Sequence, residues 1–164
     1  MLVVLLFFFS SVASAQDSSG NLTSKNSYDF GLQGGVMLSR GIRGMTEPIP
    51  GWSIRASSPT RHGVFEISSF LGRGNGESYH TFNLDYRIDF ELFDADTAHI
   101  VFGGHADYYK PIRRDAAFGL GWQLGGGLMT PLAGNLALRG DFRSRFGPGT
   151  SLEVLVGFNF RFAQ

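Results

Sequence analysis

The sequence predicts an all-β fold, an eight-stranded antiparallel up-and-down transmembrane β-barrel. Three observations lead to this prediction. Eight segments alternate apolar and polar residues with a period of two, and the links between them alternate between longer and shorter. In addition, the 164-residue chain is rich in Gly (23) and Phe (16) but contains no Cys. That composition suits strands and turns, and it excludes disulfides, thiolate metal sites and lipid attachment at a cysteine.

The N-terminal region has the features of a cleavable signal peptide. Leu2 to Phe9 form an apolar run, and Ala13-Ser14-Ala15 follows as a small-x-small cleavage site. The run is too short for a membrane-spanning helix, which needs about 20 residues. We therefore expect a signal peptide at 1–15, a polar leader at 16–27 and one barrel domain at 28–164. The formal net charge of zero argues against a nucleic-acid partner.

The alternating pattern defines the strands. The fourth segment shows it most clearly, since its apolar and charged residues fall on opposite faces of a strand, whereas a helix would spread them around its surface. The expected strands are approximately 28–38, 51–58, 62–72, 79–93, 97–109, 118–130, 134–146 and 150–162. The polar faces of the fourth, seventh and eighth carry Asn83, Asp85, Arg87, Asp89, Glu91, Arg139, Asp141, Arg143, Arg145, Glu153, Leu155, Gly157, Asn159 and Arg161.

The lengths of the links distinguish the two ends of the barrel. Outer-membrane barrels have long loops outside and short turns in the periplasm, and an even strand number places both termini on the short-turn side. The longer links follow odd-numbered strands, at Ser39–Pro50, Arg73–Ser78, Lys110–Ala117 and Gly147–Gly149. The tight links follow even-numbered strands, at Pro59–Arg61, Asp94–Asp96 and Pro131–Ala133.

The alternation alone is compatible with two kinds of barrel, because a soluble lipocalin-like barrel turns its apolar face inward and a membrane barrel turns it outward. Both lysines, Lys25 and Lys110, lie outside the expected strands, and enclosed charge favours Arg over Lys. The polar face is also rich in Gly and Ser, as a narrow lumen requires. Aromatic residues, including Trp52, Tyr79 and Phe158, cluster near strand ends as two girdles. These features favour a polar lumen and a lipid-facing apolar surface.

The stretch Phe118–Phe162, FGLGWQLGGGLMTPLAGNLALRGDFRSRFGPGTSLEVLVGFNFRF, resembles the closing hairpins of the outer-membrane β-barrel family, which includes the small OmpA-, OmpX- and OmpW-like barrels. Within it, Gly157, Phe160 and Phe162 resemble the signal by which the barrel assembly machinery recognises its clients. It departs from the usual form, since Leu155 replaces a polar residue and Ala163-Gln164 follow the last aromatic. The resemblance implies a monomer in the bacterial outer membrane, surrounded by lipid and lipopolysaccharide.

Charged residues on the polar face are expected to form a structural network, because charges in a narrow lumen must be paired to offset desolvation. Simple hairpin register places Glu91 opposite His99, Asp85 opposite His105, Glu66 opposite Asp85, and Arg143 opposite Glu153. We expect no catalytic residues, cofactor or metal site; one Ser–His pair, in Ser78-Tyr79-His80 at the outer rim, is the enzymatic alternative. The expected network comprises Glu66, Asp85, Arg87, Asp89, Glu91, His99, His105, Arg139, Asp141, Arg143, Glu153 and Arg161.

Two function classes follow from this barrel. The first is a structural or surface-interaction protein, and the second is a transporter, either a narrow pore or an OmpW-like sideways route for small molecules. Short loops and a filled lumen favour the first, and a soluble lipocalin-like binder is the least favoured. The longer loops carry a basic excess, so Lys110, Arg113 and Arg114 are expected to contact lipopolysaccharide phosphates.

Overall fold

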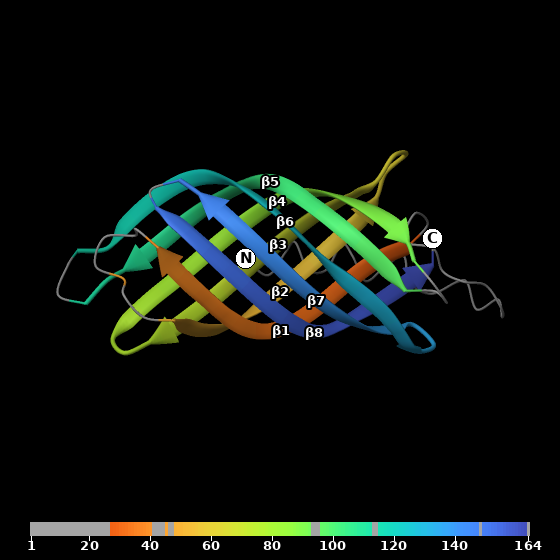
Figure 1. Cartoon of the computed structure of the whole chain (residues 1–164), viewed down its shortest axis with the longest axis horizontal. Coiled ribbons are helices and arrows are strands. Elements are labelled where there is room, and N and C mark those ends of the chain that lie inside the picture. The colour runs from red at the N-terminus through yellow and green to blue at the C-terminus, as the bar shows by residue number, and fades with distance from the viewer. Residues whose placement is uncertain are drawn as a thin grey trace, which may run out of the picture.

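Eight antiparallel strands close into a barrel, which confirms the predicted fold class (Figure 1). Each strand pairs with the next, and β8 pairs with β1. The computed structural model describes residues 27–40, 45, 48–92, 96–112, 115–147 and 149–163, so the predicted signal peptide lies outside the described residues. In this described part, no helix has the length and apolar character to cross a membrane. The strands are β1 (Ser27–Arg40), β2 (Ile49–Pro59), β3 (Val64–Gly74), β4 (Glu77–Glu91), β5 (Thr97–Lys110), β6 (Ala117–Ala133), β7 (Leu136–Phe146) and β8 (Thr150–Ala163).

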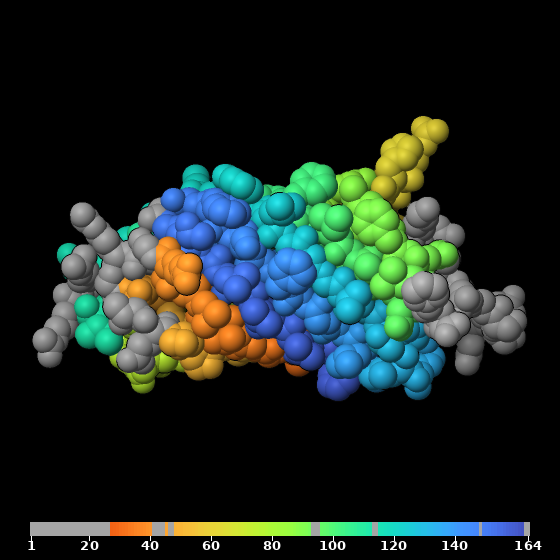
Figure 2. All heavy atoms as spheres, viewed as in Figure 1, coloured from red at the N-terminus to blue at the C-terminus, as the bar shows by residue number. Residues whose placement is uncertain are grey.

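The two faces of the barrel wall have opposite chemistry. Along β4, Asn83, Asp85 and Arg87 are buried in the lumen, while Phe82 and Leu84 between them are exposed on the outside. The same alternation runs through the other strands, and Figure 2 shows the outer wall as a continuous layer of side chains on the face in view. A surface this rich in exposed Phe, Leu, Ile and Val is suited to contact with the hydrocarbon of a membrane and not with water. The apolar face therefore points outward, as the sequence predicts.

Two links differ from the expectation. The expected longer link at Arg73–Ser78 is a two-residue turn, because β3 and β4 continue to Gly74 and Glu77. Asn75 and Gly76 have φ of 47° and 85°, the left-handed values that a tight hairpin requires and that Asn-Gly favours. At the opposite end, β6 runs through Pro131 to Ala133 with an irregular register there, since proline cannot donate a hydrogen bond to the ladder.

The register of the β4–β5 hairpin is also different. The strands end at Glu91 and Thr97, which face each other, and a backbone hydrogen bond from Leu92 N to Asp96 O closes the link. A tight turn at Asp94–Asp96 would instead place Glu91 opposite His99. Every pair in the hairpin is consequently shifted by two residues from the expected one. Because the shift is even, the residues keep their faces.

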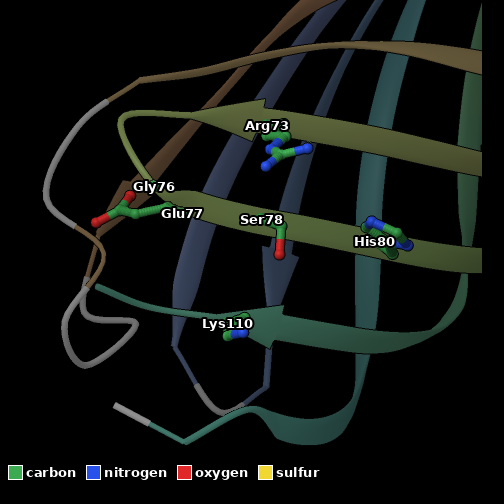
Figure 3. Close-up of a pocket in the computed structure, with 6 residues that line it drawn as sticks. All are labelled: Arg73, Gly76, Glu77, Ser78, His80 and Lys110. Carbon is green, nitrogen blue, oxygen red and sulfur yellow. The ribbon is translucent and has the colours of Figure 1, made fainter. Parts of the chain in front are cut away.

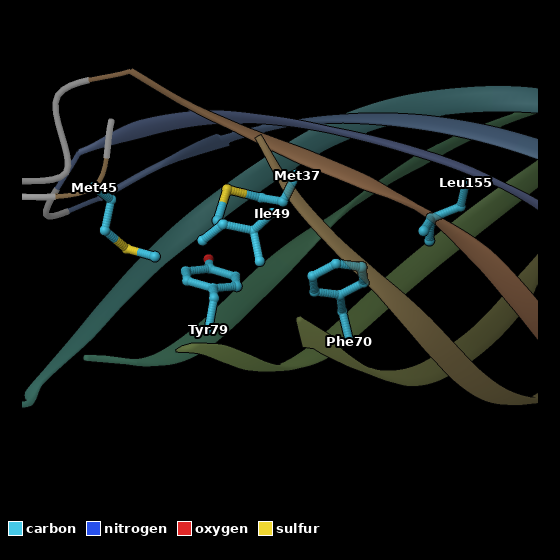
Figure 4. Packing of buried hydrophobic residues seen from close by; sticks show 6 residues of the cluster. All are labelled: Met37, Met45, Ile49, Phe70, Tyr79 and Leu155. Carbon is cyan, nitrogen blue, oxygen red and sulfur yellow. The ribbon is translucent and has the colours of Figure 1, made fainter. Parts of the chain in front are cut away.

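An apolar cluster fills the lumen near the end that carries the β1–β2 link (Figure 4). Its side chains come from β1, β2, β3, β4, β8 and the link itself, and Tyr79 packs against Phe70 with ring centroids 6.3 Å apart. Tyr79 is fully buried, so the expectation that it belongs to the outer aromatic girdle is wrong. Its odd position in β4 gives it the lumen face. The cluster consists of Met37, Met45, Ile49, Phe70, Tyr79 and Leu155, and we call it the apolar plug.

The seam between β1 and β8 leaves no room for a side chain at Gly157. A Cβ at this position would collide with the carbonyl oxygen of Leu32 and lie 2.5 Å from Cα of Gln33, both on the facing strand β1. Glycine here lets the first and last strands approach closely enough to close the barrel.

We expect Gly157→Ala to destabilise the barrel by about 1–3 kcal/mol, because the backbone of β1 or β8 must shift to accept the methyl group. The matched control is Gly140→Ala on β7, where a Cβ meets only the carbonyl oxygen of Leu155, at 4.0 Å. That change should alter stability by less than about 0.5 kcal/mol. Urea unfolding in lipid vesicles measures both. Equal stabilities for the two variants would show that the seam is not tightly packed.

Candidate functional site

Glu66 lies at the centre of the lumen, where four guanidinium groups surround one carboxylate. Its Oε1 is 3.2 Å from Nη1 of Arg55 and 2.5 Å from Nη2 of Arg143. Its Oε2 is 3.1 Å from Nη1 of Arg87 and 2.8 Å from Nη1 of Arg139. All five side chains are at most 1% exposed. Glu66 on β3 thus links β2, β4 and β7 across the lumen.

Glycine provides the space that these long side chains occupy. A Cβ at Gly31 would lie 2.8 Å from Cγ of Arg55, and one at Gly125 would lie 3.0 Å from Cγ of Arg143. Both glycines are on lumen-facing positions of strands that neighbour the arginine. The small residues on the polar face therefore make room for the buried arginines on the adjacent strands.

Asp141 is the second centre of the network. Its Oδ1 is 2.9 Å from Nη2 of Arg139, and its Oδ2 is 3.0 Å from Nη2 of Arg55. His99 places Nε2 at 2.8 Å from Oδ1, and Gln33 donates from Nε2 to Oδ2 at 2.6 Å. Gln33 also accepts a hydrogen bond from Arg55 through Oε1. A buried carboxylate with this many donors is compensated for the loss of water.

The network extends from these centres toward both ends of the barrel. On the side of the apolar plug, Asp85 binds Arg143 at 3.0 Å and accepts a hydrogen bond from Gln123 at 2.6 Å. Gln123 in turn accepts from Arg145, which is 2.6 Å from Glu153 and donates to the Tyr79 hydroxyl at 3.2 Å.

At the opposite end of the network, Arg87 binds Asp29 at 2.7 Å and Asp89 at 2.8 Å. Nε of Arg161 on β8 lies 3.9 Å from Asp29. All eight strands contribute at least one side chain to these contacts, so the network ties the whole wall together.

Three of the expected network residues need correction. Glu91 is exposed at the end of β4 and faces Thr97, so it is outside the network. His99 faces Asp89 and contacts Asp141, not Glu91. His105 faces Asn83 in place of Asp85, and its Nδ1 is 3.0 Å from Oδ1 of Asp107. The shifted β4–β5 register is the cause in each case.

The remaining expected residues lie in the lumen. Glu66 faces Asp85, and Arg143 faces Glu153, at the expected positions of their hairpins. Facing positions do not fix the ion pairs, however, since Glu153 binds Arg145 and Arg143 reaches Glu66 and Asp85.

Sequence reasoning missed several members of the network. Arg145 stands on the polar face of the seventh segment, and Arg55 lies between two serines, Ser53 and Ser57, at lumen positions of β2. Extending the alternation through the weaker first and second segments predicts lumen positions for Arg55 and also for Asp29, the partner of Arg87. Nothing in the sequence pattern indicates that Gln33, Gln123 and Tyr79 join the same network.

A pocket of about 280 Å³ lies at the outer rim (Figure 3). Ser78 and His80, the alternative Ser–His pair, both line it. The His80 ring makes an edge contact with Tyr108 at 6.0 Å, and in the described part of the chain no carboxylate is seen to orient this imidazole. A catalytic Ser–His pair needs such a third group to hold its base in place. The lining residues are Arg73, Gly76, Glu77, Ser78, His80 and Lys110.

Those positions expected to contact other molecules that the structure describes lie on the outside or at the seam. Lys110 ends β5 and is exposed, while Arg113 and Arg114 lie outside the described residues. Phe160 on β8 is exposed on the outer face, Phe162 is half-buried there, and Gly157 sits in the seam with β1. No group of three or more His, Asp or Glu side chains among the described residues is arranged to hold a metal ion.

Comparison with solved structures places this barrel beside small outer-membrane barrels. The N-terminal β-barrel domain of Pseudomonas aeruginosa OprF matches with a TM-score of 0.66 at 15% identity, covering 84% of this chain and 98% of that domain. Neisserial surface protein A matches at 0.65 and 11% identity, covering 85% and 98%. Ail, the attachment invasion locus protein of Yersinia pestis, matches at 0.58 and 10%, covering 84% and 97%.

No protein-family model and no curated protein sequence matches the chain. The structural matches confirm the resemblance to small eight-stranded outer-membrane barrels at the level of the fold.

Proposed function

We propose that the protein is a structural, surface-interacting barrel of the bacterial outer membrane that does not conduct ions. The observation that carries this proposal is the filling of the lumen. The ion-pair network around Glu66 and Asp141 occupies the middle, and the apolar plug closes the half that holds Met37 and Tyr79. A hydrated ion crossing the lumen would have to break buried ion pairs and then enter an apolar layer.

The strand pairing of the described residues also argues against a sideways route. Every strand is paired with both neighbours, and the β4–β5 and β5–β6 ladders run without a break over most of their length. A lateral path for small apolar molecules, the transport alternative, requires a gap in such a ladder. A closed ladder instead supports a rigid wall, which suits a structural role.

The other partners belong to the same proposal. We infer that the protein is a monomer. We also infer that the barrel assembly machinery recognises Gly157, Phe160 and Phe162, and the exposed side chain of Phe160 is accessible to such a partner from the outer face. The rim of β5 carries Lys110, which supports contact with lipopolysaccharide phosphates. Among the structural neighbours, Ail has been crystallised in complex with the heparin analogue sucrose octasulfate, and by analogy we propose that the rim of the present barrel binds anions. We propose no enzymatic activity, because among the described residues the contact seen for the His80 ring is with Tyr108 and not with a carboxylate.

Planar-bilayer recording tests the proposal directly. The wild-type barrel should give no discrete current steps, because ions find no continuous aqueous path. As a positive control, Glu66→Ser combined with Arg143→Ser removes one anion and one cation from the network centre and leaves space between the strands. This variant should give small current steps when ions also pass the side chains of the apolar plug. Steps from the wild-type protein at low voltage would overturn the proposal in favour of a narrow pore.

A further inference from the structure

A row of polar and basic side chains crosses three strands at the outer rim. Arg73 on β3 faces Ser78 on β4, and Ser78 faces Lys110 on β5. Arg73 and Lys110 are exposed and Ser78 is half-buried. All three occupy outward positions of their strands, and Figure 3 shows them in line across β3, β4 and β5. We call Arg73, Ser78 and Lys110 the rim row.

The rim row lines the same pocket as His80, which lies one position further along the outward face of β4. Glu77 also lines the pocket, but it occupies a lumen-facing position of β4 and is buried. Among the outward residues of β3, β4 and β5, all of which are described, there is no carboxylate. The outward side of the pocket therefore presents two fixed cations, a hydroxyl and an imidazole.

The position of the rim row along the barrel axis indicates which kind of anion it can bind. Directly below it on the same three strands lie Leu71, His80 and Tyr108, and Phe82 follows on β4. From Phe82 to Phe90 the outward residues of β4 are apolar or aromatic over about 20 Å of membrane depth, close to the apolar band of about 25 Å in such barrels. The rim row thus stands where hydrocarbon gives way to lipid headgroups.

The opposite ends of these strands are different. Among the described outward residues of β3, β4 and β5, no Arg or Lys lies at the end near Phe65, Phe90 and Ala98, and the exposed cation at that end, Arg61, belongs to the link before β3. A general preference for cations near both interfaces does not explain this one-sided placement. A ligand that is present at one membrane face only does explain it.

We infer that the rim row binds the phosphate group of a lipid in the outer leaflet, with the acyl chains lying on Leu71, Tyr108 and Phe82 below it. Arg73 supplies a guanidinium fork that matches two phosphate oxygens, Lys110 supplies a point charge, and Ser78 supplies a hydroxyl donor. The apolar surface below the cations favours a lipid phosphate over a free anion. This inference deepens the proposed contact of Lys110 with lipopolysaccharide phosphates and rests on the proposed membrane location, but not on the proposed lack of conductance.

The test uses the full barrel folded in a zwitterionic detergent and titrated calorimetrically with dihexanoyl phosphatidic acid, which joins a phosphate to short acyl chains. We expect saturable binding to wild type and a dissociation constant about tenfold higher, or more, in the double variant Arg73→Gln, Lys110→Gln, because two charge-assisted contacts are lost. The matched control is Arg40→Gln with Arg61→Gln, which removes two exposed cations away from the rim row. It should bind within about twofold of wild type.

Several results would overturn the inference. Equal affinity in wild type and the Arg73→Gln, Lys110→Gln variant would show that the lipid binds elsewhere. An equal loss in the control would show that net charge alone attracts it. Binding of inorganic phosphate as tight as that of phosphatidic acid would show a free-anion site. Ser78→Ala, a smaller change, should weaken binding severalfold and keeps the test valid if the double variant folds poorly. Bilayer recordings are independent of all these titrations, so a conducting barrel would refute the proposed function and leave this inference standing.

Discussion

Replacement of Glu66 by alanine is expected to destabilise the barrel by about 3–5 kcal/mol. The change removes the one carboxylate that Arg55, Arg87, Arg139 and Arg143 share. Arg87 keeps Asp29, Arg143 keeps Asp85, and Arg55 and Arg139 must share Asp141, so the four guanidinium groups lose the anion that lies between them. Buried charge without compensation is the largest penalty that a single substitution can impose on this network.

The control for this experiment is Glu91→Gln. Glu91 has the same side chain and belongs to the expected network, yet it is exposed at the end of β4. Its replacement should change the free energy of unfolding by less than about 0.5 kcal/mol. Urea unfolding in lipid vesicles, followed by tryptophan fluorescence, measures both variants. A loss in Glu91→Gln as large as that in Glu66→Ala would contradict the central position of Glu66.

A double variant separates charge imbalance from lost packing. Glu66→Ala combined with Arg139→Met removes one surplus cation from the group that Glu66 holds, and methionine keeps part of the buried volume. If uncompensated charge dominates, the double variant should be more stable than Glu66→Ala alone, with a coupling energy of at least about 1 kcal/mol. Additive losses would instead indicate that water enters the lumen and solvates the arginines.

Replacement of Leu124 by arginine is expected to cost about 2–4 kcal/mol, the value for a cation at the bilayer midplane on the lipid face. Leu124 lies near the middle of β6 and is 50% exposed on the outer surface. Phe118→Arg is the matched control, since Phe118 has an outward position on the same strand but lies near its outer end. There the same charge reaches the interface and should cost only about 0–1 kcal/mol.

The comparison of Leu124→Arg with Phe118→Arg tests which solvent surrounds the barrel. In a membrane, the cost depends on depth, because only the midplane position places the guanidinium in hydrocarbon. Around a water-soluble barrel of the lipocalin type, both positions would be solvated and both variants would be tolerated. Refolding into vesicles at a series of urea concentrations gives the two free energies. Similar small values for both variants would contradict the lipid-facing assignment.

The wall of the barrel follows from local sequence properties. A period of two places Phe82 and Leu84 on one face of a strand and Asn83 and Asp85 on the other, and the partition between hydrocarbon and lumen depends only on that face. Turn residues act just as locally, and Asn75-Gly76 is the strongest hairpin signal in the chain. The prediction of a longer link at Arg73–Ser78 is therefore wrong, although the sequence contains the signal for the two-residue turn.

The interior depends on contacts that no local pattern contains. Arg139 and Arg143 reach Glu66 across 73 and 77 positions of sequence, because the tilt and stagger of a closed barrel decide which strands face each other through the lumen. The β4–β5 register shows the same limit, since a shift of two residues places His99 opposite Asp89 in place of Glu91, and His99 contacts Asp141. The apolar plug likewise gathers Met37, Phe70 and Leu155 from β1, β3 and β8, and β1 and β8 are far apart in the sequence although they pair in the barrel.

The sequence by itself determined the strand number, the face of nearly every side chain and the chemistry of the outer surface, because each of these follows from alternation along one strand. Only the tertiary structure decided which charges pair, that Glu66 is their centre, and that Arg73, Ser78 and Lys110 form one row at the rim. Those outcomes require the register between strands and the closure of the sheet. Closure sets distances between residues that are far apart in the chain, and the free energy of the buried charges depends on these distances.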